Sequence, residues 1–470
     1  MNWHHPVMVR GEMPPLPAWW LWLALPVAGI ALAALGLFFT WPLQRGFTDP
    51  RFWIYLLLLP MLLSLAVNAF MLSAALQARR KVIWRQLFID HKRAQWQHWG
   101  RRSLYLSAWH CLTPEADLAP RLLGLEGSQP EPPAMARALA AGQDPVLGTC
   151  RLTDIFSQLL NPLQTQWQNQ LLPEIWLWVN TEQQQASQAL RQSWLTQQNH
   201  SLADDRLHWL STPPDAGLFA DWCDQTFIQP RLLLVIYLRE EGIPLDEFAV
   251  ALLMQPPNCR TAKNSEFRSL YLFRPLISSA DKLEQDLPAL LAVQQTDIKR
   301  LQHLWDSGLT RRQRLSLYAL LDEQGVDLPA KGRHELVQQL GPAVPASLWL
   351  ALVIAAQAGD LAQRGQWVAA EDAQTLSILQ LSTQPAAKVD LPQTELPRYP
   401  LTYLCAIFAL LLVLLLLPVD PQTQQMMLPW LAGGFVLVAG LLSFAMPLEQ
   451  QLWRKQWDAE WSRLEENPDD

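Results

Sequence analysis

The sequence predicts a mixed-sheet α/β domain flanked by two α-helical transmembrane hairpins. Apolar residues of the 470-residue chain are concentrated in the first 76 positions and between positions 401 and 448. The stretch between these two regions is polar enough to be water-soluble. Within it, short apolar runs rich in β-branched and aromatic residues alternate with polar helical stretches, which is typical of an α/β fold.

The predicted hairpins cover residues 18–76 and 401–448, and their four apolar segments carry no charged side chain. The segments are Ala18 to Thr40, Phe52 to Leu76, Leu401 to Val419, and Met427 to Leu448. Each is close to the length that crosses a hydrocarbon core of about 30 Å at 1.5 Å per residue. The first segment is too long for a secretory signal peptide, so we expect a signal anchor.

Tryptophan is abundant, with 23 residues in the chain, and part of this surplus lies at the ends of the predicted spans. An indole has an apolar body and one N–H donor, so it prefers the headgroup level of a bilayer. The residues predicted at the membrane interface are Trp19, Trp20, Trp41, Trp53, Trp430 and Trp453. Other tryptophans belong to the core of the soluble domain or to its contacts.

A cationic stretch follows the second span and predicts the orientation of the chain. Its residues include Arg79, Arg80, Lys81, Arg85, Lys92 and Arg93, within a basic juxtamembrane helix predicted over 77–102. Lysine and arginine are retained on the cytoplasmic side of a membrane. Two interpretations stay open for these cations: attraction to anionic lipid headgroups, and a plain topology determinant.

Both hairpins then agree on one orientation in a bacterial inner membrane. The N-terminal residues 1–17, the central domain over 103–390 and the C-terminal residues 449–470 are predicted on the cytoplasmic side. A proline-rich linker over 391–400 joins the domain to the third span. No internal repeat is visible apart from the two hairpins.

Strands and helices of the central domain are predicted from periodicity and turn residues. The predicted strands are 104–111, 174–179, 207–211, 231–239, 248–255, 268–274, 367–370 and 375–381. The predicted helices are 153–171, 182–197, 215–229 and 281–293. Their alternation favours a mixed sheet covered on both faces.

Composition excludes several function classes. A formal net charge of -7 argues against a nucleic-acid partner, because binding phosphates needs clustered cations. The cysteines are odd in number, widely spaced and never arranged as C-x-x-C, which predicts buried free thiols rather than a metal site. No phosphate-binding glycine loop, zinc-protease motif or serine elbow occurs, so neither a cofactor nor a metal is predicted.

Isolated residues remain as candidates for chemistry. His110 and Cys111 end a predicted strand, where an α/β fold often places its working groups, but neighbouring strand residues point to opposite faces. Another candidate is the turn after the strand 231–239, whose carboxylates suit acid–base or metal work but are more often a solvated hairpin. These carboxylates are Glu240, Glu241, Asp246 and Glu247.

Two histidines have acidic neighbours in the sequence and are candidate bases. His334 lies beside Arg333 and Glu335, and His208 follows Asp204 and Asp205. None of the four cysteines Cys111, Cys150, Cys223 and Cys259 lies in a nucleophile context.

Parts of the domain resemble the thiolase and ketoacyl-synthase fold. Pro230 to Arg239 followed by Asp246 to Met254 is similar to a strand pair of that fold. Leu340 to Ala356 followed by Gly365 to Ala370 is similar to a helix and strand of its C-terminal half. Active members use a nucleophilic cysteine with two histidines, and that set cannot be matched residue by residue here. The resemblance therefore implies a degenerate, non-catalytic relative.

The membrane-tethered arrangement is also similar to that of inner-membrane components that accompany bacterial type VI secretion clusters. The leading hypothesis is a non-enzymatic multi-pass protein, in contact with membrane lipid, whose cytoplasmic domain binds a protein partner associated with secretion machinery or a toxin. The alternative is a membrane-bound enzyme acting on a lipid or acyl substrate. An oligomer is compatible with either hypothesis.

Overall fold

The computed structural model describes residues 3–4, 6–42, 48–139, 150–167, 172–239, 242, 245–256, 270–344, 346–362, 365–372, 375–389, 402–416 and 421–466. The chain divides into two compact units. One unit contains residues 1–5 and 95–389, and we call it the central domain. The other contains residues 6–94 and 390–470, and we call it the helical unit. Each is described by itself.

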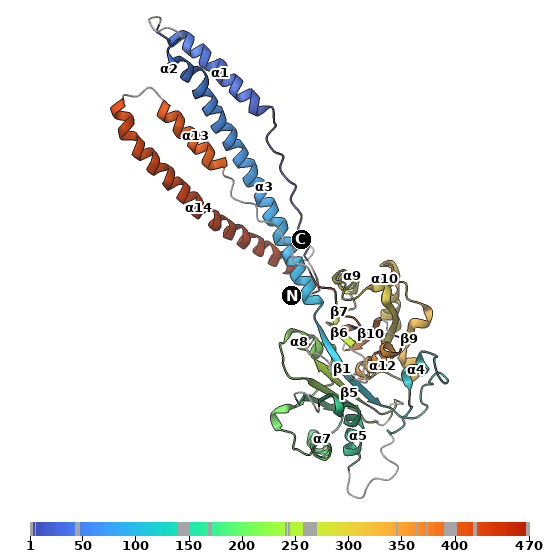
Figure 1. Cartoon of the computed structure of the whole chain (residues 1–470). Coiled ribbons are helices and arrows are strands. Elements are labelled where there is room, and N and C mark those ends of the chain that lie inside the picture. The colour runs from blue at the N-terminus through green and yellow to red at the C-terminus, as the bar shows by residue number, and fades with distance from the viewer. Residues whose placement is uncertain are drawn as a thin grey trace. The chain divides into compact units, whose positions relative to one another are not determined.

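Long apolar helices build the helical unit (Figure 1). They are α1 (Leu21–Thr40), α2 (Pro50–Trp53), a π-helical turn (Ile54–Leu58), α3 (Leu59–Gly100), α13 (Thr402–Leu416) and α14 (Pro421–Glu466). The π-helical turn precedes Pro60, which has no N–H to donate to the turn before it, so a local change of hydrogen-bond pattern is expected there. The predicted second span and basic helix form one continuous helical stretch, Pro50–Gly100, made up of α2, the π-helical turn and α3.

Two stretches among the described residues, Leu21–Thr40 and Pro50–Gly100, are long and apolar enough to cross a membrane. The third and fourth predicted spans contain shorter apolar stretches, Leu404–Val413 and Pro429–Leu441. Length and composition alone do not separate a span from a buried core helix, so burial is the more informative property. None of the 20 residues of α1 is buried.

Helices α3 and α14 are joined by charged contacts beyond their apolar parts. The contacts are Gln77 Nε2 to Glu449 Oε1 at 3.0 Å, Arg80 Nη2 to Glu449 Oε2 at 3.4 Å, Arg85 Nη2 to Glu460 Oε1 at 2.6 Å, and Lys92 Nζ to Asp458 Oδ1 at 2.9 Å. The earlier residues Gln77 and Arg80 contact Glu449, and the later residues Arg85 and Lys92 contact Glu460 and Asp458, so the helices run parallel. We call residues 77–92 and 449–460 the α3–α14 charged segment.

The central domain is built on one continuous sheet. Its strands are β1 (Ser103–Leu112), β2 (Glu174–Val179), β3 (Leu207–Trp209), β4 (Arg231–Tyr237), β5 (Phe248–Gln255), β6 (Leu270–Phe273), β7 (Leu276–Ser279), β8 (Leu301–Ser307), β9 (Arg333–Glu335), β10 (Gly365–Asp372) and β11 (Thr375–Ser382). The strand order is β3-β2-β4-β5-β1-β6-β11-β10-β8-β9, and β7 also pairs with β11. Parallel and antiparallel pairs both occur, so the mixed α/β sheet is confirmed.

Helices cover both faces of this sheet. They are α4 (Leu118–Leu122), α5 (Arg151–Leu160), α6 (Gln164–Trp167), α7 (Gln183–Gln198), α8 (Ala216–Asp224), α9 (Leu283–Val293), α10 (Arg311–Glu323), α11 (Leu336–Leu340) and α12 (Ser347–Ala362). One face carries a single apolar core that includes residues of α8 and α12. The opposite face has two separate cores, one with α5 and α7 and one with α9 and α10.

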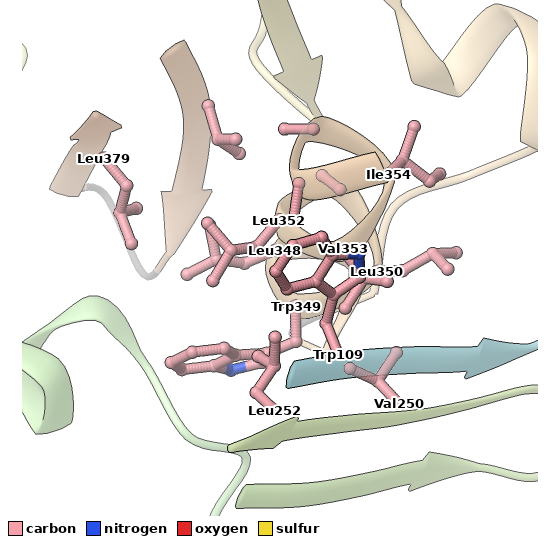
Figure 2. Packing of buried hydrophobic residues seen from close by; sticks show 14 of the residues in the cluster. Trp109, Val250, Leu252, Leu348, Trp349, Leu350, Leu352, Val353, Ile354 and Leu379 are labelled. Atoms are coloured by element: carbon pink, nitrogen blue, oxygen red, sulfur yellow. The ribbon is translucent and has the colours of Figure 1, made fainter. Parts of the chain in front are cut away.

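Helix α12 fixes the centre of the domain. Every side chain from Trp349 to Ala356 is buried. The helix is apolar on all sides because protein surrounds it. In Figure 2 its side chains lie over Trp109, Val250 and Leu252 of the sheet. α12 therefore shows how this chain buries an apolar helix inside its own core, in contrast to α1.

The sheet consists of two halves with the same topology, a repeat that sequence analysis missed. In the first half β2, β3 and β4 are parallel, and β5 runs antiparallel between β4 and β1. In the second half β8, β9 and β10 are parallel, and β11 runs antiparallel between β10 and β6. Strands β1 and β6 join the halves antiparallel at Tyr105 and Tyr271. Helices α8 and α12 occupy corresponding places on the shared face.

A pair of stacked rings occurs at the same register position of each half. Trp176 of β2 lies opposite His208 of β3, with ring centroids 4.6 Å apart. Trp305 of β8 lies opposite His334 of β9, with ring centroids 4.0 Å apart. This correspondence aligns the two halves residue by residue. The sequence hides the repeat because few other side chains are shared between corresponding strands.

Candidate functional site

The end of β1 holds His110 and Cys111, the first of the isolated candidate residues in the sequence. The pairing of β1 with β5 shifts by one residue between Leu106 and Ala108, and such a bulge changes which side chains face the core. As a result Trp109 and Cys111 pack against the same core as Leu106. A cavity of about 540 Å³ adjoins this strand end, and its lining includes His110, Cys111, Gln357 and Asp360.

The thiol in this cavity is a poor nucleophile. Burial raises the pKa of Cys111 to about 11, although Gln357 donates a hydrogen bond to its sulfur at 3.6 Å. Burial also lowers the pKa of His110. Both side chains are therefore neutral at pH 7, and His110 follows Trp109 on the other face of the strand. The cavity therefore holds a protonated thiol rather than an activated thiolate, and its lining also carries the acids Glu115, Asp117 and Asp360.

The other cysteines lie apart from one another. Burial raises the pKa of Cys223, in α8, to about 12. Cys150, which precedes α5, and Cys405, in α13, are exposed. Cys259 lies outside the described residues. Among the residues that the structure describes, no group of three or more His, Cys, Asp or Glu side chains is arranged to hold a metal ion.

Carboxylates before β5 form ion pairs instead of a solvated turn. Asp246 accepts hydrogen bonds from Arg137, with Nη2 to Oδ2 at 2.6 Å. Glu247 is fully buried, pairs with Arg151 and accepts the Leu139 backbone N–H at 2.8 Å. The expectation of a solvated hairpin is therefore wrong for Asp246 and Glu247. Glu240 and Glu241 lie outside the described residues.

Glu247 and its partners tie distant segments to β5. Arg151 begins α5, so the pair joins α5 to the sheet. Asp246 joins the segment around Arg137 to the same strand. A structural role therefore accounts for both carboxylates, because each has an arginine partner.

His334 does not form the predicted acid–base pair with Glu335. Its ring is 4% exposed and stacks on Trp305, and its Nε2 lies 3.0 Å from His303 Nδ1. Glu335 instead pairs with Arg314, with Oε2 to Nη1 at 2.6 Å. Neighbouring residues on a strand point to opposite faces, which explains why sequence adjacency misled the prediction.

His208 likewise serves packing more than acid–base chemistry. Its ring stacks on Trp176, which also contacts Trp222 with centroids 5.3 Å apart. Asp204, the acid proposed to orient His208, pairs with Arg191 at 2.7 Å. The structure therefore brings His208 together with aromatic rings and gives Asp204 a different partner.

Burial of His334 predicts a loss of stability in mild acid. Burial and the neighbouring His303 lower the pKa of His334 from its ordinary value of 6.5 to about 4. The unfolded chain binds the proton first as pH falls, so stability is lost between pH 6.5 and pH 4. The free energy of unfolding should therefore be lower at pH 5 than at pH 7. We expect His334→Gln to reduce this difference by about 2 kcal/mol, measured by urea unfolding at both pH values. An unchanged pH dependence in that variant would contradict this assignment.

Sequence analysis missed a buried ionic cluster next to this histidine. Asp306, at the end of β8, is fully buried and pairs with Arg314 of α10. The Leu309 backbone N–H donates to Asp306 at 2.8 Å, and Arg314 also reaches Glu335. Burial raises the pKa of Asp306. The sequence offered one clue, because an acid that ends an apolar strand before the helix-capping Thr310 is unusual.

The predicted membrane-interface tryptophans lie at helix ends or on helix surfaces. Trp19 and Trp20 are exposed just before α1, and Trp41 follows α1 and contacts Phe52 with ring centroids 5.2 Å apart. Trp53 and Trp430 are exposed on α2 and α14. The Arg80 guanidinium lies over the Trp453 ring, 5.8 Å from the ring centroid.

The predicted headgroup-binding cations lie on α3, and several contact α14. Arg80, Arg85 and Lys92 belong to the α3–α14 charged segment, and Lys81 lies 5.9 Å from the Trp453 ring. Arg79 Nε donates to the Pro14 carbonyl at 2.7 Å. Lipid binding by these residues stays a prediction, as it does for Arg93.

No family model matches the chain. No curated protein matches it either. Among solved structures, 3-oxoacyl-(acyl carrier protein) synthase III from Pseudomonas aeruginosa PAO1 is similar at 14% identity and a TM-score of 0.37, covering 61% of this chain and 100% of that one. An oxazolomycin ketosynthase domain from Streptomyces albus JA3453 is similar at 12% identity and a TM-score of 0.39, covering 63% and 100%.

OleA from Xanthomonas campestris, bound with cerulenin, is similar at 12% identity and a TM-score of 0.33, covering 60% of this chain and 95% of that one. These similar structures are of the thiolase and ketosynthase kind that the sequence resembles. TM-scores of this size assign neither a fold family nor an activity. The resemblance to secretion-associated proteins stays a prediction, because none of these comparisons bears on it.

Proposed function

We propose that this chain is a multi-pass protein of the bacterial inner membrane whose cytoplasmic central domain binds a protein partner. The observation that carries the membrane part is the exposure of α1. Its apolar residues include Leu32, Leu35 and Phe38, which are 60 to 82% exposed. A soluble protein rarely leaves so large an apolar surface uncovered, whereas lipid would cover it.

A further feature supports anchoring by both hairpins. The α3–α14 charged segment begins on both helices directly after their apolar parts, at Gln77 and Glu449. The charged residues of these two parallel helices thus begin at positions that contact each other. We therefore expect both helices to leave the bilayer at the same depth and on the same side. The cations of that segment are then retained in the cytoplasm.

Binding rather than catalysis is proposed for the central domain because the candidate residues at the end of β1 are not activated for nucleophilic attack. A protonated Cys111 and a neutral His110 do not supply the thiolate that nucleophilic attack needs. The tryptophans of the domain do not add to this argument: Trp194, Trp305 and Trp349 are fully buried core residues. They account for part of the tryptophan surplus.

Site-directed photocrosslinking in native membranes tests the binding proposal. A photoreactive amino acid at Met135 or Ile228, which are 81% and 80% exposed, should trap one discrete protein. The same amino acid at Leu32 should crosslink to lipid and serves as the matched control. If neither position in the central domain gives a crosslink to another protein, that result would count heavily against the proposal.

A second candidate is a membrane-bound enzyme acting on a lipid or acyl substrate. The specific feature that favours it is the cavity that adjoins Cys111 and His110. This candidate predicts that Cys111→Ser, His110→Ala and Cys223→Ser each abolish the cellular phenotype. Wild-type behaviour of all three variants would exclude it.

A further inference from the structure

The internal repeat identifies positions where the two halves of the central domain have diverged. Trp176 and Trp305 correspond, and they pair with Leu233 of β4 and Val368 of β10. The preceding residues, Leu232 and Trp367, therefore correspond as well. Their antiparallel partners are Leu253 of β5 and Gln380 of β11.

In the first half Leu232 and Leu253 belong to a closed apolar core. In the second half Trp367 and Gln380 line a cavity of about 550 Å³. Its polar lining also includes Gln295, Thr296, Gln324 and Gln384. The second half thus has a roomy, amide-rich cavity where the first half has tightly packed leucines.

Two residues that line this cavity each carry a deeply buried polar atom without a protein partner among the described residues. Trp367 is 1% exposed, and its indole Nε1–H has no acceptor. Gln295 is 2% exposed, and its Oε1 has no donor. The Gln295 amide is held in place because its Nε2 donates to the carbonyls of Gly100 at 2.7 Å and Arg274 at 2.9 Å.

The indoles of Trp305 and Trp176 give the comparison, and the Nε1 of Trp176 also lacks a partner among the described residues. The Trp305 Nε1–H donates to Gln366 Oε1 at 2.8 Å. Leaving a buried donor or acceptor without a partner is unfavourable, so most native structures satisfy such groups. Trp367 and Gln295 differ from Trp176 because both line one cavity, where a bound molecule can supply an acceptor and a donor.

We propose that this cavity binds an uncharged secondary amide, as presented by a peptide segment of the protein partner. A secondary amide carries one carbonyl for the Trp367 N–H and one N–H for Gln295 Oε1. The cavity lining has one acid and one strong base, Asp297 and Arg300, so it does not select for a charged ligand. Leu290 of the lining can contact an alkyl side chain next to the amide. This inference rests on the proposed function and specifies its binding site.

The test uses the full chain in lipid nanodiscs and N-acetyl-leucine N-methylamide as the probe, with binding followed by saturation-transfer NMR. We expect Trp367→Phe, which keeps the aromatic ring and removes the N–H, to weaken binding about tenfold. Gln380→Leu introduces the residue type of Leu253 in the first half and should also weaken binding. Trp305→Phe removes an indole N–H outside the cavity and should leave binding unchanged.

A second probe tests whether the amide N–H of the ligand contributes to binding. The methyl ester of N-acetyl-leucine lacks the C-terminal amide N–H and should bind several-fold more weakly than the amide. No binding of the amide by the wild-type chain, or equal binding by the wild type, Trp367→Phe and Gln380→Leu, would overturn the inference.

Crosslinking separates this inference from the proposed function. Loss of the trapped partner in Trp367→Phe, with the partner retained in Trp305→Phe, supports the cavity as the peptide site. A partner trapped equally by both variants overturns the cavity assignment and leaves the protein-binding function intact.

Discussion

Replacing Arg314 with methionine is expected to destabilise the central domain by about 3 kcal/mol. Arg314 is the ionic partner of the fully buried Asp306 and also pairs with Glu335. Methionine fills a similar volume but leaves the Asp306 carboxylate buried without a cation. Urea unfolding of the full chain in detergent, followed by pulse proteolysis, measures the change.

The matched control is Arg191→Met, which removes an ion pair with Asp204 whose side chains are 48% and 84% exposed. Exposed pairs contribute little, so we expect a change of about 0.5 kcal/mol or less. Adding Asp306→Asn to Arg314→Met should recover part of the loss, because the uncompensated charge is then removed. Equal effects of Arg314→Met and Arg191→Met would refute a buried ionic cluster.

An arginine in the middle of α1 is expected to oppose membrane insertion by about 3 kcal/mol. Leu32 lies near the centre of this helix and is 70% exposed, so the proposed anchor places Leu32→Arg against lipid. The fraction of glycosylation-tagged chains that insert in a microsomal assay measures the effect.

Leu361→Arg is the control for that substitution. Leu361 is 51% exposed at the end of α12, in the central domain, where water can solvate the new charge. We expect no effect on insertion and less than about 0.5 kcal/mol on folding. If Leu32→Arg inserts as well as the wild type, α1 does not contact hydrocarbon.

Sequence patterns predicted the most apolar elements of the central domain well. β2 and β5 begin and end where expected, because both are short apolar runs bounded by turn residues. β8 and β9 were missed. They contain His303, Asp306, His334 and Glu335, and their polar character reflects local partners that the sequence does not reveal.

The candidate site was less predictable because it depends on register. Whether Cys111 faces the core is determined by the bulge in β1, and the partner of Glu247 lies 96 residues away in sequence. The repeat is visible only through strand order and two stacked Trp–His pairs. Trp367 and Gln295 carry no motif, and their unpartnered atoms become apparent only in three dimensions.

The most direct test of the membrane arrangement uses the native Cys150. It is exposed in the central domain, whereas Cys111 and Cys223 have raised pKa values and react slowly with maleimides. A membrane-impermeant maleimide is applied to a Cys259→Ser chain, with an additional Cys150→Ser substitution as the control. Labelling of Cys150 in inverted vesicles but not in intact spheroplasts is predicted, and labelling in intact spheroplasts would contradict a cytoplasmic domain held by membrane hairpins.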